Sequence, residues 1–82
     1  VWDVVDDAAL MDEAGKIARR LAAGPTLSYA AIKEAISAAA TNTLDQQLDL
    51  ERDRQRELGR SADFKEGVAA FLAKRPANFT GR

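Results

Sequence analysis

Apolar side chains recur along the chain at intervals of three, four and seven residues, the spacing that places them on one face of an α-helix. Gly24-Pro25 interrupts this pattern, and Pro76 should end it, because proline keeps the residue before it out of the helical region. Only Val1–Val5 differs, with the β-branched and aromatic residues typical of a strand. The pattern therefore predicts an all-α segment of about four helices after a short N-terminal strand, with helices near residues 6–23, 26–40, 43–58 and 61–75.

Polar residues at the start of the expected helices satisfy backbone N–H groups that have no partner within the helix. Thr43 and Gln46 have the spacing of a capping box, in which each side chain accepts a hydrogen bond from the other residue's backbone N–H. Ser61 is the expected N-cap of the last helix. The pair Asp6-Asp7 is expected to cap the first helix and to place negative charge at its N-terminus.

The expected strand Val1–Val5 has no partner, because no second strand pattern occurs in the remaining residues. The backbone N–H and C=O groups of a strand need a neighbouring strand to satisfy them. We therefore expect residues 1–5 to be the last strand of a core that lies outside this chain. Residues 6–82 are then expected to be a helical domain at the C-terminus of a longer protein.

The expected helix over residues 43–58 carries far more charge than apolar surface. Opposite charges three residues apart should each stabilise it by about 0.2–0.5 kcal/mol. A solvated face is the simpler interpretation of this charge. The alternative is a subunit interface, at which arginine and aspartate pair between chains. The four expected pairs are Asp49–Arg52, Glu51–Arg54, Asp53–Arg56 and Glu57–Arg60.

Composition excludes several classes of function. The 82 residues contain neither cysteine nor histidine, which removes the most common nucleophile–base pairs and thiolate zinc sites. The 12 basic and 13 acidic residues give a net charge of −1, which argues against nucleic acid as a partner. No apolar run approaches the ~20 residues that span a bilayer, so no membrane partner is expected. We expect a cytoplasmic protein with no metal and no cofactor, and no catalytic residue in this segment.

The end of the chain combines aromatic and basic side chains in an otherwise polar stretch. Phe71 and Lys74 lie three residues apart and hence on neighbouring parts of one helical face. An aromatic ring beside an ammonium can bind a phosphorylated purine, with the ring against the base and the ammonium against a phosphate. On spacing alone the simpler interpretation is that Phe71 is a core residue and that Lys74 is a favourable charge at a helix C-terminus.

The sequence of this end resembles that of a known family. Residues 61–82, SADFKEGVAAFLAKRPANFTGR, contain the pattern E-G-x-x-A-F-x-x-K-R-x-x-x-F, which is similar to the C-terminus of enoyl-CoA hydratase/isomerase (crotonase-like) proteins. The start, VWDVVDD, resembles the last strand of their core and the entry into their C-terminal helices. Residues 41–67, TNTLDQQLDLERDRQRELGRSADFKEG, resemble the phenylacetate-pathway members that isomerise a ring epoxide.

The resemblance implies the C-terminal helical region of a crotonase-fold α/β protein, which builds a trimer or a dimer of trimers and helps to cover the CoA site. In the family a preceding core binds the acyl-CoA thioester as the substrate. Two backbone N–H groups of that core stabilise the enolate charge, and its acidic side chains move the protons. Phe71 and Lys74 match the tail positions that contact the adenine and ribose phosphate of CoA, so the resemblance makes them the expected CoA-binding residues. Arg75 is not expected in that site.

The activity implied for the whole protein is that of an isomerase, which converts the ring epoxide of phenylacetyl-CoA to its oxepin isomer or shifts the double bond of an enoyl-CoA. The first alternative is a fatty-acid enoyl-CoA hydratase. Two catalytic glutamates in the preceding core would indicate a hydratase, and a single acidic residue would indicate an isomerase. The second alternative is a helical oligomerisation module without a ligand. CoA binding by the whole protein separates this module from both enzymes.

Two smaller features follow from the same family pattern. Gly67 lies inside the last expected helix, where glycine costs ~1 kcal/mol of helix stability, and should allow another backbone to approach closely. Phe79 is expected to pack back against the helices and anchor the end of the chain.

Overall fold

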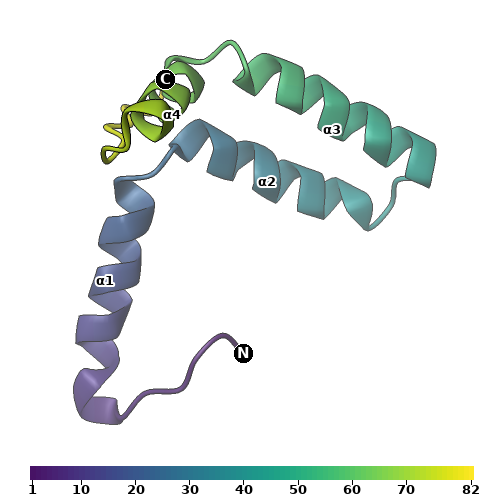
Figure 1. The fold of residues 1–82 in the computed structure, drawn as a ribbon. Coiled ribbons are helices and arrows are strands. Elements are labelled where there is room, and N and C mark those ends of the chain that lie inside the picture. The colour runs from purple at the N-terminus through teal and green to yellow at the C-terminus, as the bar shows by residue number, and fades with distance from the viewer.

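The computed structural model describes residues 1–82 and contains a short 3-10 turn followed by four α-helices (Figure 1). No strand is present. The all-α prediction for this segment is therefore confirmed, with helix bounds close to those expected. None of the four helices combines the length and the apolar character needed to cross a membrane. The elements are η1 (Asp7–Ala9), α1 (Leu10–Ala22), α2 (Thr26–Ala39), α3 (Leu44–Leu58) and α4 (Ala62–Ala73).

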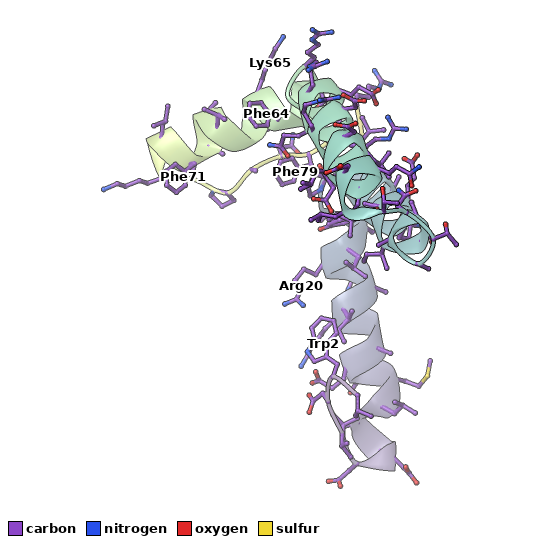
Figure 2. All side chains as sticks on the ribbon, turned by 90° about the vertical axis from the view of Figure 1, so that its right-hand side faces the viewer. Trp2, Arg20, Phe64, Lys65, Phe71 and Phe79 are labelled. Atoms are coloured by element: carbon purple, nitrogen blue, oxygen red, sulfur yellow. The ribbon has the colours of Figure 1, made fainter.

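Residues 1–6 form a segment without regular secondary structure. The strand expected over Val1–Val5 does not form within this chain, because its backbone groups need a neighbouring strand and the chain supplies only helices. The segment lies beside α1, where the Arg20 guanidinium is 5.9 Å from the centre of the Trp2 ring, a cation–π contact (Figure 2). The assignment of Val1–Val5 to a core outside this chain stays a prediction.

The first helix starts differently from the expected one. Asp6 has an extended backbone, but its side chain caps no helical N–H group. Its carbonyl accepts a hydrogen bond from the Ala9 N–H at 2.8 Å, which closes the 3-10 turn, and the α-helix begins only at Leu10. Asp6 and Asp7 therefore place negative charge near a helix N-terminus, and the predicted side-chain cap is wrong.

The helices α2 and α3 run antiparallel, side by side, and form the central hairpin of the structure (Figure 1). Arg54 on α3 donates to both carboxylate oxygens of Glu34 on α2, at 2.7 and 2.8 Å, and also to Glu57. The Gln47 side chain donates to the Ala35 carbonyl at 2.9 Å. The bidentate hydrogen bonds lower the pKa of the Glu34 carboxyl and raise the pKa of the Arg54 guanidinium.

The start of α3 agrees with the sequence. The Thr43 hydroxyl accepts from the Gln46 N–H at 3.2 Å, and the Gln46 side chain accepts from the Thr43 N–H at 2.9 Å, so the capping box is confirmed. The expected pair Glu51–Arg54 does not form, because Arg54 binds Glu34 across the hairpin instead. The pair Glu57–Arg60 does not form either, and Glu57 accepts from Arg54. Two expected pairs do form, at 3.2 and 3.9 Å, namely Asp49–Arg52 and Asp53–Arg56.

Very little of the chain is buried within itself. Only Ala70 and Asp63 are buried, at 2% and 4% exposure, whereas many large apolar side chains are exposed. The radius of gyration is 16.1 Å, compared with the roughly 12 Å of a compact chain of this length. The helix α1 extends away from the α2–α3 hairpin in a different direction (Figure 1). The helices therefore present apolar faces that need a further surface to cover them.

Candidate functional site

The end of the chain folds back along α4. Ser61 caps this helix, as predicted, by accepting a hydrogen bond from the Phe64 N–H at 3.0 Å. After α4 the chain reverses, and residues 76–82, which we call the tail, return toward the start of the helix. There the Arg82 carbonyl accepts from the Asp63 N–H at 2.8 Å. The C-terminus consequently lies close to α4 (Figure 1).

The reversal takes place at Lys74, the only non-glycine residue with a left-handed backbone (φ 53°, ψ 45°). The Arg75 N–H donates to the Ala70 carbonyl at 3.0 Å, and the Lys74 N–H donates to the Phe71 carbonyl at 3.2 Å. These two bonds define a Schellman motif, whose left-handed position is usually glycine. A lysine in this conformation costs about 1–2 kcal/mol. The helix thus ends before Pro76, as expected, but the turn is made at Lys74, and Arg75 is already outside the helix.

Asp63, in the first turn of α4, holds the far end of the tail. Its two carboxylate oxygens accept from the Thr80 N–H at 2.8 Å and from the Gly81 N–H at 2.9 Å. Gly81 has a φ of 78°, and a β-carbon there would lie 2.8 Å from the Thr26 hydroxyl, so this position requires glycine. The Asp63 carboxylate thus binds a distant part of the chain, in addition to its favourable charge interaction with the N-terminus of α4.

Glu66, one turn further along α4, holds the near end of the tail. Its Oε1 atom accepts from the Arg75 guanidinium and, at 3.2 Å, from the Asn78 N–H. These bonds lower the pKa of the Glu66 carboxyl below its ordinary value of 4.5, and the bond from Arg75 has the larger effect. A lowered carboxyl pKa stabilises the folded state above about pH 4.5, and that stabilisation is lost only as the pH falls through the lower value. The ion pair therefore persists at neutral pH.

The Phe79 ring packs against α4 at Gly67. In the tail, Phe79 lies between Asn78, which Glu66 binds, and Thr80, which Asp63 binds. A β-carbon at Gly67 would lie 3.5 Å from Cε1 of this ring, which is an ordinary contact. Phe79 thus anchors the tail, as predicted. The close backbone approach predicted at Gly67 does not occur within this chain, because the neighbour is a side chain.

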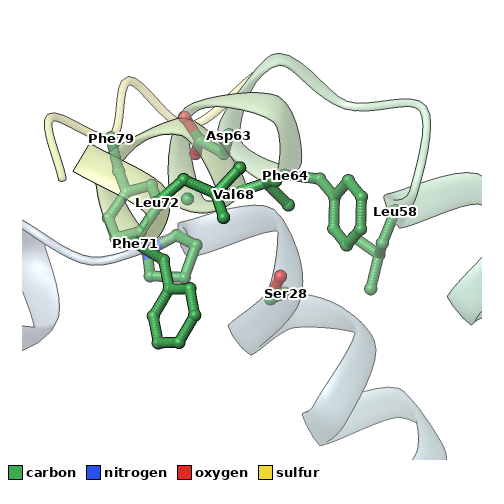
Figure 3. Close-up of a pocket in the computed structure, with 10 residues that line it drawn as sticks. Ser28, Leu58, Asp63, Phe64, Val68, Phe71, Leu72 and Phe79 are labelled. Carbon is green, nitrogen blue, oxygen red and sulfur yellow. The ribbon is translucent and has the colours of Figure 1, made fainter. Parts of the chain in front are cut away.

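A shallow apolar groove of roughly 360 Å³ lies between α4, the start of α2, the end of α3 and the tail (Figure 3). Phe64, Val68 and Phe71 of α4 line it together with Phe79 of the tail. Asp63 is the only charged residue in the lining, and tail N–H groups already occupy its oxygens. The groove offers apolar contact and no free group for acid–base chemistry.

Phe71 and Lys74, the residues predicted to bind CoA, both lie at the C-terminal end of α4. Phe71 is 82% exposed and projects from α4 on the side of the groove, so it is not a core residue of this chain (Figures 2 and 3). Lys74 is exposed and takes part in none of the salt bridges. It follows the helix rather than sharing a face with Phe71. The Arg75 guanidinium turns back to Glu66, in agreement with its exclusion from the predicted site.

Comparison with known proteins places this arrangement in a family. All of residues 1–82 match the family model for enoyl-CoA hydratase/isomerase, and the chain belongs to that family. The 1,2-epoxyphenylacetyl-CoA isomerase of Escherichia coli (strain K12) is 61% identical over 82 residues, which are 100% of this chain and 31% of that protein. A probable enoyl-CoA hydratase of Rhodobacter capsulatus is 49% identical over 82 residues, 100% of this chain and 32% of that protein.

A solved structure shows the same arrangement of helices. A crystal structure from Mycobacterium abscessus, assigned to enoyl-CoA hydratase/isomerase, superposes with a TM-score of 0.94 at 40% identity. The match covers 100% of this chain and 32% of the other. The chain thus spans about a third of the length of the curated relatives it matches. The predicted resemblance to crotonase-like proteins is confirmed, and the open arrangement is one that a longer protein of the family also has.

Replacing Gly67 by alanine is expected to raise the thermal stability of the intact protein. Alanine favours a helix interior by up to about 1 kcal/mol, and its methyl group would meet only the edge of the Phe79 ring. Gly15→Ala in α1 is the matched control, because it brings the same helical gain without a contact to the tail. Melting temperatures of the three proteins measure the effect. A lower melting temperature for Gly67→Ala, but not for Gly15→Ala, would mean that a surface outside this chain packs closely against Gly67.

Proposed function

We propose that these 82 residues are the C-terminal helical part of an acyl-CoA isomerase, to which they supply subunit contacts and one end of the CoA site. The observation that carries this proposal is the 61% identity, over the whole chain, to a relative named 1,2-epoxyphenylacetyl-CoA isomerase. The proposed reaction converts the ring epoxide of phenylacetyl-CoA to its oxepin isomer. A double-bond shift in an enoyl-CoA is the related reaction. The residues that move protons are proposed to lie outside this chain.

Phe71 and Lys74 are proposed to hold the adenine and phosphate end of CoA. The exposed Phe71 ring offers a flat apolar surface to a purine base, and the Lys74 ammonium has no carboxylate partner that would compete with a phosphate. A helix C-terminus is normally unfavourable for an anion because of its free carbonyls. Here the Ala70 and Phe71 carbonyls accept the two Schellman bonds, which reduces that repulsion. This end of α4 therefore repels an anion less than a helix C-terminus whose carbonyls are all free.

Lys74→Ala and Phe71→Ala are each expected to weaken CoA binding by the intact protein about three- to tenfold, because each removes one partly exposed contact. We expect kcat with saturating acyl-CoA to change little, since both side chains would touch only the nucleotide. Lys65→Ala is the matched control: Lys65 is an exposed lysine on the same helix, at its opposite end (Figure 2). Isothermal titration calorimetry with CoA measures the affinities. Wild-type affinity in both site variants would exclude a CoA role for this segment.

An enoyl-CoA hydratase is the second candidate for the whole protein. The 49% identity to a probable enoyl-CoA hydratase supports it. The two activities differ in their products, because a hydratase adds water to the double bond and an isomerase leaves the mass of its substrate unchanged. Mass spectrometry of the products formed by the intact protein from an enoyl-CoA and from the ring epoxide would distinguish the two.

The exposed apolar faces are proposed to be covered by further copies of the protein, as a trimer or a dimer of trimers, and by the remaining two thirds of the parent protein. Four residues on the α2–α3 hairpin are more than half exposed and support this proposal, namely Ile32, Ile36, Leu44 and Leu48. Sedimentation velocity of the intact protein measures the oligomeric state. Oligomers that bind no CoA would favour a helical oligomerisation module without a ligand. A cytoplasmic location and a part in phenylacetate catabolism stay predictions.

A further inference from the structure

Glu66 is bonded to the chain immediately after the left-handed residue Lys74. The next residue, Arg75, donates from its Nη1 atom to Glu66 Oε1, and the Asn78 N–H donates to the same oxygen at 3.2 Å. The Arg75 Nη1 atom also donates to the Pro76 carbonyl at 3.1 Å. A single carboxylate on α4 thus holds both the side chain and the backbone of the turn that follows Lys74.

Lys74 adopts a conformation that lysine does not prefer by itself. The helix-end bonds of the Lys74 and Arg75 N–H groups favour this conformation, but they would form equally well, and with less strain, if the residue were glycine. The Glu66 side chain is only 27% exposed, and its carboxyl, whose pKa is lowered by the bonds from Arg75 and Asn78, is charged at neutral pH. The ion pair therefore favours the observed geometry of the turn, and with it the direction in which the Lys74 side chain leaves α4.

We propose that Glu66 is a positioning residue for the nucleotide end of the CoA site, which holds the turn after α4 so that the Lys74 ammonium meets a phosphate of the ligand. The inference rests on the CoA-binding role proposed above for Lys74. Glu66 is proposed to act through the turn rather than by touching the ligand, because its Oε1 atom accepts from Arg75 and Asn78. Asp63 binds only the far end of the tail and is not expected to share this role.

The test is CoA binding by the intact protein, measured by isothermal titration calorimetry for wild type, Glu66→Gln, Lys74→Ala and the double variant. Glu66→Gln keeps a hydrogen-bond acceptor but loses the charge that holds Arg75. We expect CoA affinity to fall about three- to fivefold, because fewer molecules have the turn in its binding geometry. The same change should have no further effect in the Lys74→Ala background. Pantetheine, which lacks the nucleotide of CoA, should bind all four proteins equally.

Glu13→Gln is the matched control for this experiment. Glu13 is also an ion-paired glutamate on a helix, 3.0 Å from Lys16, but it lies on α1 and makes no bond to the turn. This variant should bind CoA as the wild type does. Weaker binding by Glu13→Gln, to the same extent as by Glu66→Gln, would overturn the inference, because loss of any helical ion pair would then be sufficient.

Two further outcomes would overturn the inference while leaving the proposed function intact. The first is wild-type affinity in Glu66→Gln together with weakened binding in Lys74→Ala. The second is an effect of Glu66→Gln that persists in full in the Lys74→Ala background. If Lys74→Ala itself binds CoA normally, the role proposed for Lys74 has failed and the inference fails with it. Should Glu66→Gln not fold, Arg75→Gln removes the other half of the ion pair and carries the same expectations.

Discussion

Replacing Asp63 by asparagine is expected to lower the free energy of unfolding of the intact protein by about 2–3 kcal/mol. The Asp63 carboxylate is 4% exposed and accepts from the N–H groups of Thr80 and Gly81, one on each oxygen. Asparagine keeps one acceptor oxygen but turns an NH2 group toward the second N–H, so that two donors face each other in a buried place. The tail then loses one of the two side-chain bonds at its far end, while Phe79 and Glu66 still hold its nearer part.

Asp45→Asn is the control for this prediction. Asp45 is the second residue after the N-cap of α3, as Asp63 is in α4, but it is exposed, and the cap bonds there come from Thr43 and Gln46. Both variants lose the same interaction with a helix N-terminus, about 0.3–1 kcal/mol. Denaturant unfolding of the two proteins therefore isolates the contribution of the tail bonds. Equal losses would mean that Asp63 serves only the helix N-terminus.

The 82 residues alone are expected to show helical circular dichroism without a cooperative thermal transition. Ala70 and Asp63 are the only buried residues, so little apolar surface would be released together on heating. Helices of 12 to 15 residues are marginal in water unless they pack against another surface. A circular dichroism melt of the isolated chain, compared with that of the intact protein, measures the difference.

Protein concentration provides the control for that melt. A transition that sharpens and moves to higher temperature as the concentration rises would show that copies of this chain cover one another's apolar faces. A sharp transition that does not depend on concentration would contradict the prediction. It would mean that the contacts within one chain are sufficient for cooperative folding.

Local signals were sufficient to predict the helices but not how the last one ends. The capping box of Thr43 and Gln46 and the Ser61 cap were predicted because each is contained in four consecutive residues. Pro76 was the strongest signal for the end of the last helix. The left-handed residue at which the chain turns is nevertheless Lys74, and no local rule predicts a lysine at a position that is usually glycine. The conformation of the first five residues could not be predicted from their own sequence, because a segment with a strand pattern forms a strand only beside a partner strand.

The anchors of the tail could not be predicted from periodicity, since the partners of Asp63 lie 17 and 18 residues later. The sequence did contain a signal for these anchors. Asp63 and Glu66 are carboxylates three residues apart on one helix, and the tail that follows contains Gly81, which can adopt a left-handed backbone. The choice of Phe71 and Lys74 came from family resemblance, and spacing alone favoured the opposite interpretation. Within this chain, the exposed Phe71 ring and the Lys74 ammonium without a carboxylate partner give that choice a physical basis.

The fold-back of the tail also bears on the order of folding. The bonds that close it, from Asp63 and Glu66 to the tail, all lie within residues 61–82, so the loops that must close are short. Short loops close quickly and at a small cost in chain entropy, whereas the apolar faces of α1 and of the hairpin must wait for surfaces outside the chain. The last helix and its tail can therefore form without those outside surfaces. The end of α4 would then already be formed when this chain packs against other surfaces.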